Sequence, residues 1–186
     1  MSEANTEAKL IPDDRNGYWA GRANSLNYSF TFDMAKKYAP NAKSAIDVGC
    51  FVAPVICQLD WIPVRIANDL AHIPEWDGVQ GVKFVQGDAF ALNPRDYCDD
   101  DMFDLAISHQ TIEHIEDAKG FADKLCKLGR RVICSTSYEV EAGLIAGHVQ
   151  DPISLQKFES WFPRPAQSIL IERHPGGRFA NILGIF

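Results

Sequence analysis

The stretch Ser44–Cys50, with the sequence Ser-Ala-Ile-Asp-Val-Gly-Cys, decides how the rest of this chain can be arranged. It is short, mostly apolar and followed by turn-forming residues, which predicts a strand buried on both faces of a sheet. Pro54 lies just beyond it and opens the run Val55–Leu59, and proline suits the first turn of a helix. We therefore predict a buried strand that passes through a glycine turn into a helix. Such a unit places free N–H groups at the carboxyl end of a sheet, where open α/β sheets bind ligands.

Size and composition restrict the classes of protein to which this chain can belong. The 186 residues suit one domain, which we expect to span residues 13–186 behind a flexible tail, residues 1–12. No apolar run approaches the roughly 20 residues of a membrane span, and the first residues carry no signal-peptide core. The formal net charge of −7 argues against a nucleic-acid partner. Five cysteines without C-x-x-C spacing predict free thiols in a reducing compartment, so we expect a cytoplasmic protein without a zinc site.

Further strands and helices follow in alternation along the chain. Short apolar runs predict strands at residues 64–69, 82–85, 103–108, 131–135, 168–171 and 179–185. Helical spacing of apolar residues predicts helices at residues 27–38, 116–128 and after 152. The last two strands are joined through Pro175–Gly177, which predicts a hairpin. The fold class is therefore α/β: a doubly wound three-layer sandwich around a seven-stranded, mostly parallel sheet with an antiparallel last strand.

Several residues could contact a ligand at the edge of this sheet. Asp69 ends the second strand, and a carboxylate in that position can accept hydrogen bonds from ribose hydroxyls. Tyr18 and Trp19, beside Gly21, can anchor a lid over a ligand or equally plug the edge of the core. The acidic loop at residues 94–102 could hold a cation, but its acids lack ligand spacing, which favours a solvated surface loop.

With these residues in place, the chain from Ser44 onward resembles the class I S-adenosylmethionine-dependent methyltransferases. Ala45–Cys50 matches the first motif of the family, and Asp69 stands where its ribose-binding acid is expected. Gly87–Phe90 looks like the turn that reads adenine, with Asp88 near the exocyclic amine. The most specific match is Phe103–Ile115, which ends in Ile-Glu-His-Ile. It is similar to the fourth strand and following turn of the small-molecule, methyltransferase type 11-like branch.

The resemblance implies a Rossmann-like methyltransferase fold, in which the last strand lies between the fifth and sixth. It also implies S-adenosylmethionine as the cofactor and a small molecule or biosynthetic intermediate as the methyl acceptor, with no membrane partner. The compact size leaves room for a second copy of the chain to complete the cleft as a homo-oligomer. The cofactor-binding residues implied by the resemblance lie at the strand tips: Asp47, Gly49, Cys50, Asp69, Leu70, Asp88, Ala89, Ser108 and His109.

Catalytic candidates follow from the chemistry of methyl transfer. Positioning does much of the work, and a neutral nucleophile also needs a nearby base. His109 at a strand tip and His148 in the long connection at residues 138–151 are the candidates, because histidine titrates near neutrality. The alternative for His109 is to hold the turn. His114 joins Tyr18 and Trp19 as a substrate-binding candidate, its alternative being to pack behind the turn.

We expect no metal site. Glu113 and His114 could form a metal-binding pair, but adjacent residues of a helix point to different faces.

One departure from the family pattern keeps other functions open. The family places glycines at positions 51 and 53, where this chain has Phe51 and Ala53. Phenylalanine in the left-handed conformation costs about 1–2 kcal/mol, so either the loop takes another path or the pocket is altered. We expect the Phe51 ring to turn away from the methionine moiety. If it fills the pocket instead, the protein would be a binding module without catalysis. A nicotinamide-dependent oxidoreductase is a third possibility, weakened by the same missing glycines and by the final hairpin.

Overall fold

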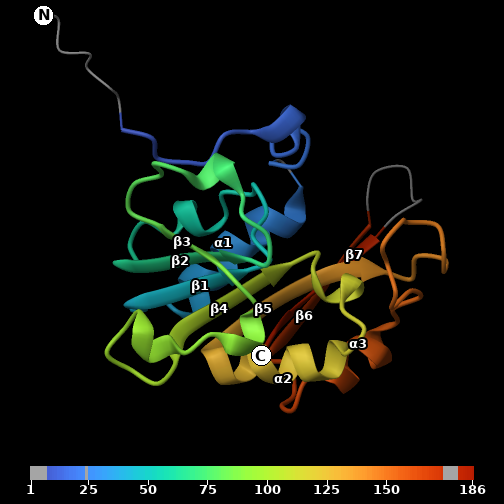
Figure 1. Cartoon of the computed structure of the whole chain (residues 1–186). Helices are drawn as coiled ribbons and strands as arrows, with labels where there is room; N and C mark the ends of the chain where they lie inside the picture. Colours follow the sequence, from blue (N-terminus) through green and yellow to red (C-terminus); the bar gives the residue numbers. More distant parts are fainter. Residues whose placement is uncertain (1–7, 24, 174–179) are drawn as a thin grey trace, which may run out of the picture.

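A computed structural model describes residues 8–23, 25–173 and 180–186, and its centre is a seven-stranded sheet (Figure 1). The strand order is β3-β2-β1-β4-β5-β7-β6. The strands are β1 Ser44–Val48, β2 Val64–Asp69, β3 Lys83–Gln86, β4 Phe103–His109, β5 Gly129–Tyr138, β6 Ser168–Arg173 and β7 Ala180–Ile185. Strands β1 to β5 pair in parallel, whereas β7 runs antiparallel to both β5 and β6. The predicted α/β sheet and the place of its last strand are confirmed. The turn at Pro175–Gly177 and Phe179 lie outside the described residues.

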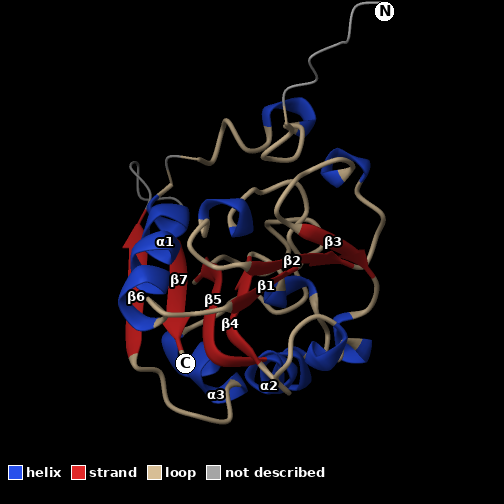
Figure 2. Ribbon diagram, turned by 90° about the vertical axis from the view of Figure 1, so that its left-hand side faces the viewer, coloured by secondary structure: helices blue, strands red, loops and turns tan. Residues whose placement is uncertain are grey.

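Three α-helices cover the two faces of this sheet: α1 Leu26–Tyr38, α2 Ala118–Leu128 and α3 Leu155–Trp161. Side chains alternate between the faces along each strand, so neighbouring residues of β5 serve two different cores. Ile133 packs in the core that contains Ala35 of α1, whereas Val132 packs in the core that contains Phe121 of α2. Figure 2 shows α1 on one side of the sheet and α2 with α3 on the other.

The helix predicted after Pro54 is wrong. The chain forms only a single 3₁₀ turn, Ile56–Gln58, before it enters β2. Pro63 comes too soon for a longer helix, and three apolar residues of this segment, Ile56, Leu59 and Ile62, are fully buried. Short 3₁₀ turns also replace helices in the next connections: Pro74–Trp76, Ala89–Ala91 and Pro94–Asp96. Loops with buried side chains therefore cover this half of the sheet.

The segment before α1 lies against the loop that follows β2. The amide of Gln80 donates to the carbonyl of Lys9 (2.8 Å), although residues 8–12 fall in the predicted tail. Two guanidinium nitrogens of Arg15 lie 2.5 Å from the carboxylate oxygens of Glu75. These contacts bring Tyr18 to the carboxyl end of the sheet.

The five cysteines are free thiols, as the sequence predicts. Within the described residues, no helix combines the length and the apolar character that crossing a membrane requires.

Candidate functional site

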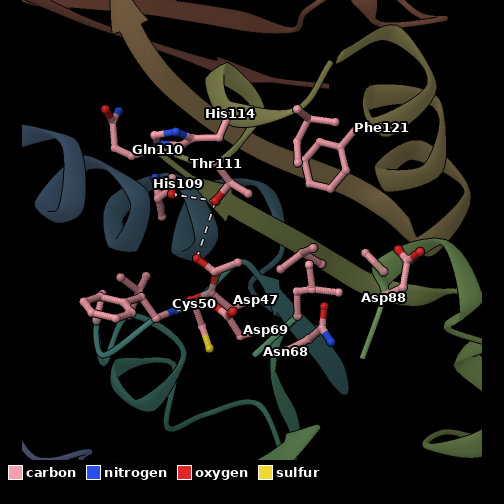
Figure 3. A pocket seen from close by; sticks show the side chains of 18 of the residues that line it. Asp47, Cys50, Asn68, Asp69, Asp88, His109, Gln110, Thr111, His114 and Phe121 are labelled. Carbon is pink, nitrogen blue, oxygen red and sulfur yellow. Dashed lines mark hydrogen bonds between the residues drawn. The ribbon is translucent and has the colours of Figure 1, made fainter. Parts of the chain in front are cut away.

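A cavity of about 370 Å³ opens at the carboxyl ends of β1, β2 and β4 (Figure 3). Its size falls within the roughly 300–1,000 Å³ usual for small-molecule sites. Nearly all of the predicted cofactor-binding residues line it: Asp47, Gly49, Cys50, Asp69, Leu70, Asp88, Ala89 and His109. Ser108 is the exception. It is fully buried, and its hydroxyl donates to the carbonyl of Val48 (2.9 Å), so it joins β4 to β1 instead of facing the cavity.

The turn after β1 depends on glycine for two reasons. Gly49 has a φ of 76°, and a Cβ atom added there would lie 2.4 Å from the hydroxyl oxygen of Thr111. The Thr111 hydroxyl lies 3.4 Å from the carbonyl oxygen of Gly49 and 3.0 Å from that of His109, as the dashed lines in Figure 3 mark. The β1 and β4 turns therefore pack directly on each other.

The backbone amides of this turn are not free, contrary to our expectation. The amides of Gly49 and Cys50 both donate to the carbonyl of Asn68 (2.8 and 3.1 Å). The side-chain amide of Asn68 in turn donates to the carbonyls of Val85 and Gly87, both at 3.0 Å. Asn68 therefore ties the first turn to β3, and a ligand would meet side chains and carbonyls here more than unpaired amides.

Phe51 adopts the left-handed conformation that glycine has in the family pattern, with a φ of 43°. Its amide donates to the Asp69 carboxylate (3.0 Å), and its carbonyl accepts from Nε1 of Trp76 (2.5 Å). The half-buried ring lines the cavity and packs edge-on against Tyr18, with centroids 4.9 Å apart. Two side-chain hydrogen bonds thus hold a strained residue in place, as strained positions require.

The floor of the cavity is acidic. Asp47 is only 2% exposed, and burial, followed by the nearby charge of Asp69, raises its pKa to about 8. Asp69 also accepts from the amide of Ala71 (3.2 Å), and Asp88 accepts from the amide of Phe90 (2.9 Å). A carboxylate offers about four acceptor positions, so both keep capacity for ligand hydroxyl or amino groups.

His109 lines the cavity, but both nitrogens of its ring already form hydrogen bonds within the protein. Its Nε2 is 2.9 Å from the Thr31 hydroxyl, and its Nδ1 is 2.6 Å from the Ser135 hydroxyl. Burial lowers its pKa to about 3, so the imidazole is neutral at pH 7. It would have to break one of these contacts before it could accept a proton from a substrate. The geometry therefore favours the alternative role, in which His109 ties the β4 tip to α1 and β5.

A second cavity, also about 370 Å³, adjoins the first. Tyr18, Gln110 and His114 line both cavities, while Glu113 and His148 line only the second. His148 places its Nδ1 2.7 Å from the Asp151 carboxylate, and His114 places its Nδ1 2.9 Å from the carbonyl of Gly147.

Trp19, predicted beside Tyr18 as a substrate contact, lines neither of these cavities and packs edge-on against Tyr28 instead, with centroids 5.0 Å apart.

Gln110 is a site residue that sequence reasoning missed. It has a φ of 49°, and its side-chain nitrogen is buried without a hydrogen-bond partner among the described residues. Such a position between two cavities suits contact with a ligand. Neither its strained backbone nor its unpaired amide can be read from the sequence, although it sits inside the Phe103–Ile115 match.

No protein-family model and no curated protein sequence matches this chain. It is similar to the 1,6-didemethyltoxoflavin-N1-methyltransferase of Burkholderia thailandensis, solved with 1,6-didemethyltoxoflavin and S-adenosylhomocysteine. The TM-score is 0.68 at 15% identity, covering 91% of this chain and 83% of that one. The magnesium protoporphyrin IX methyltransferase of Synechocystis PCC 6803, with bound S-adenosylhomocysteine, gives 0.63 at 15% identity, covering 100% and 88%. The YcgJ protein of Bacillus subtilis gives 0.62 at 14% identity, covering 86% and 96%. The chain therefore has the fold of the class I S-adenosylmethionine-dependent methyltransferases.

Proposed function

We propose that the protein is an S-adenosylmethionine-dependent methyltransferase that acts on a small molecule. The observation that carries this proposal is the first cavity, which is lined by acidic residues at or just beyond the carboxyl ends of three adjacent strands: Asp47, Asp69 and Asp88. Structural neighbours with this fold were solved with S-adenosylhomocysteine bound. The cavity lies at the carboxyl ends of the parallel strands, where sheets of this kind bind nucleotides.

The residues present fit this cofactor. Asp69 would accept hydrogen bonds from the ribose hydroxyls, and Asp88 from the exocyclic amine of adenine. Leu70 and Ala89, which line the same cavity, would contact the adenine ring, and the Gly49–Cys50 turn allows a close approach. Asp47 would face the positively charged end of S-adenosylmethionine. A cationic group there would favour the ionised form of this buried carboxyl. When bound, the cofactor supplies a methyl group on a sulfonium that is already activated.

The second cavity would hold the methyl acceptor. It adjoins the first through Tyr18, Gln110 and His114, so an acceptor there would lie beside the cofactor. Its volume of about 370 Å³ suits a small molecule. His148 is the catalytic candidate that this arrangement retains, since Asp151 fixes its ring and it lines the acceptor cavity. Its role would be to hold and orient the nucleophilic group of the acceptor.

A binding module without catalysis is the alternative, and Phe51 motivates it. Phe51 lines the first cavity at a position where the family pattern has glycine. Its ring would therefore occupy part of the space that the methionine moiety of the cofactor needs. Such a module would bind S-adenosylhomocysteine weakly or not at all and would transfer no methyl group.

Turnover separates these two functions. Purified protein would be incubated with S-adenosylmethionine and pools of small phenols, amines and carboxylates, and S-adenosylhomocysteine formation would be followed by mass spectrometry. The enzyme hypothesis predicts acceptor-dependent product that is lost in Asp69→Ala. No S-adenosylhomocysteine formation with any pool, together with weak or absent cofactor binding, would favour the module.

A further inference from the structure

The second cavity contains a buried carboxylate without a matching partner. Glu113 is 0% exposed, and neither of its carboxylate oxygens has a hydrogen-bond partner in the described part of the chain. Burial raises the pKa of Glu113, whereas the nearby hydroxyl of Thr136 and the imidazoles of His114 and His148 lower it. Burying a carboxylate is costly unless it is paired or coordinates a metal. A cation bound beside Glu113 would offset this cost and favour the ionised carboxylate.

Two histidines stand beside this carboxylate. The ligand atoms that Glu113, His114 and His148 can offer all lie within 4.8 Å of one another. The two imidazole rings are nearly perpendicular, at 86°, with centroids 4.8 Å apart. All three residues line the second cavity. We expected Glu113 and His114 to point to different faces of a helix, but the segment Ile112–His114 is a 3₁₀ turn, and both reach the same cavity.

The hydrogen bonds of the two rings leave one nitrogen of each available. Nδ1 of His148 lies 2.7 Å from the Asp151 carboxylate, and Nδ1 of His114 lies 2.9 Å from the Gly147 carbonyl. Both partners are acceptors, so each Nδ1 carries its hydrogen and each Nε2 keeps a lone pair. Histidines that bind metals are held in this way by a carboxylate or a backbone carbonyl.

Gly147 fits this arrangement as well. It has a φ of 85°, and a Cβ atom added there would lie 3.3 Å from Nδ1 of His114. The glycine therefore allows its carbonyl to approach the imidazole closely.

We propose that Glu113, His114 and His148 bind a divalent first-row transition metal, with an open coordination position in the second cavity. Two imidazoles and one carboxylate form a donor set used by Zn²⁺ and by Fe²⁺, and three protein ligands leave room for another. An acceptor with a metal-binding oxygen would take that position beside the methyl donor. This last statement rests on the proposed methyltransferase function, whereas the metal site rests only on its own residues.

Calorimetry with the metal alone tests the site. Protein treated with chelator and dialysed would be titrated with ZnCl₂ and, separately, with MnCl₂. We expect one ion per chain for at least one metal, with affinity reduced about tenfold or more in Glu113→Gln, His114→Gln and His148→Gln. His72→Gln is the matched control, because His72 is an exposed histidine near Asp77 and should keep wild-type affinity. His114 is itself exposed, so His114→Gln should fold even if Glu113→Gln does not.

Thermal unfolding of the same samples provides a second measurement of metal binding. Bound metal should raise the melting temperature of wild type and His72→Gln but not that of the three cluster variants. No saturable binding up to 1 mM metal, or equal affinity in all four variants, would overturn the proposal. Titrating each sample with S-adenosylhomocysteine keeps the two proposals apart. Metal binding that depends on the cluster without S-adenosylhomocysteine binding would sink the proposed function and leave the metal site standing.

Discussion

Phe51 shows how a large side chain can occupy a position where the resembled family pattern has glycine. Its backbone takes a positive φ, and the cost is offset by bonds from its amide to Asp69 and from Trp76 to its carbonyl. Its ring gains contacts with Tyr18 and with the guanidinium of Arg15, which lies 5.1 Å from the ring centroid. Phe51 therefore takes the positive φ that glycine would take at this position at little cost.

Replacing Phe51 by glycine and by alanine separates its ring from its backbone. Both variants lose the ring contacts, but only Phe51→Ala keeps the cost of the left-handed conformation. We expect Phe51→Gly to be the more stable of the two by about 1 kcal/mol in urea unfolding. Equal stability would mean that the backbone is not strained in solution. A tenfold or greater rise in S-adenosylhomocysteine affinity in Phe51→Gly, about 1.4 kcal/mol, would support the binding-module alternative.

Asp47 should make stability depend on pH. Its pKa is raised from 3.8 to about 8, so the folded protein binds an extra proton between these values. The free energy of unfolding should therefore fall as the pH rises through this window. We expect a smaller fall between pH 5 and pH 8 in Asp47→Asn, measured by urea unfolding. The lowered pKa of His109 acts in the opposite direction below pH 6.5, but it is common to both proteins. Identical slopes would contradict the burial of an ionisable Asp47.

At the scale of elements, the turn after β1 and the loop after β2 act as one unit. The Asp69 carboxylate accepts from the amide of Phe51, and Nε1 of Trp76 donates to its carbonyl. The Trp76 ring also stacks on Phe84 of β3, with centroids 6.1 Å apart. The shape of the first cavity therefore depends on side-chain hydrogen bonds between these two loops. No long helix of the described chain covers the sheet in this region to hold them in place.

Trp76→Phe tests this unit, because it preserves the stacked ring and removes the N–H group. We expect a loss of about 1–3 kcal/mol in urea unfolding, since the buried Phe51 carbonyl is left unpaired. Trp61→Phe is the matched control: the Nε1 of Trp61 is buried without a partner in the described structure, so its removal breaks no bond. If Trp61→Phe lowers the free energy of unfolding as much as Trp76→Phe does, the bond from Trp76 to the Phe51 carbonyl is not what holds this unit together.

The strands could be predicted from the sequence, and the connections only in part. Buried parallel strands are continuous apolar runs, which are visible in a sequence. The segments that resemble family motifs, Ala45–Cys50, Asp69, Gly87–Phe90 and Phe103–Ile115, supply most of the residues that line the first cavity. The helix after Pro54 failed because burial of Ile56, Leu59 and Ile62 by a loop overrides helix propensity. Ser108 lies outside the cavity because its hydroxyl donates to Val48 of the neighbouring strand. Gln110 was missed because a sequence does not reveal its positive φ or the bond from its backbone amide to the Ser135 carbonyl of β5.

The whole molecule places two adjoining cavities at one edge of its sheet. The first has acidic residues at the strand tips, and the second has Glu113 and two histidines. Three shared lining residues connect them, so a donor and an acceptor bound at the same time would meet near Gln110. This arrangement, more than any single residue, supports group transfer between two bound molecules.

Calorimetric titration with S-adenosylhomocysteine tests this account most directly. We predict one binding site per chain, and a loss of about 1–3 kcal/mol of binding free energy in Asp69→Ala because a buried acceptor of ribose hydrogen bonds is removed. Circular dichroism would show that the variant folds, since Asp69 also holds the Phe51 amide. NAD, titrated in parallel, should give no saturable heat. Binding of NAD but not S-adenosylhomocysteine, or equal S-adenosylhomocysteine affinity in the wild type and folded Asp69→Ala, would contradict the assignment of this cavity.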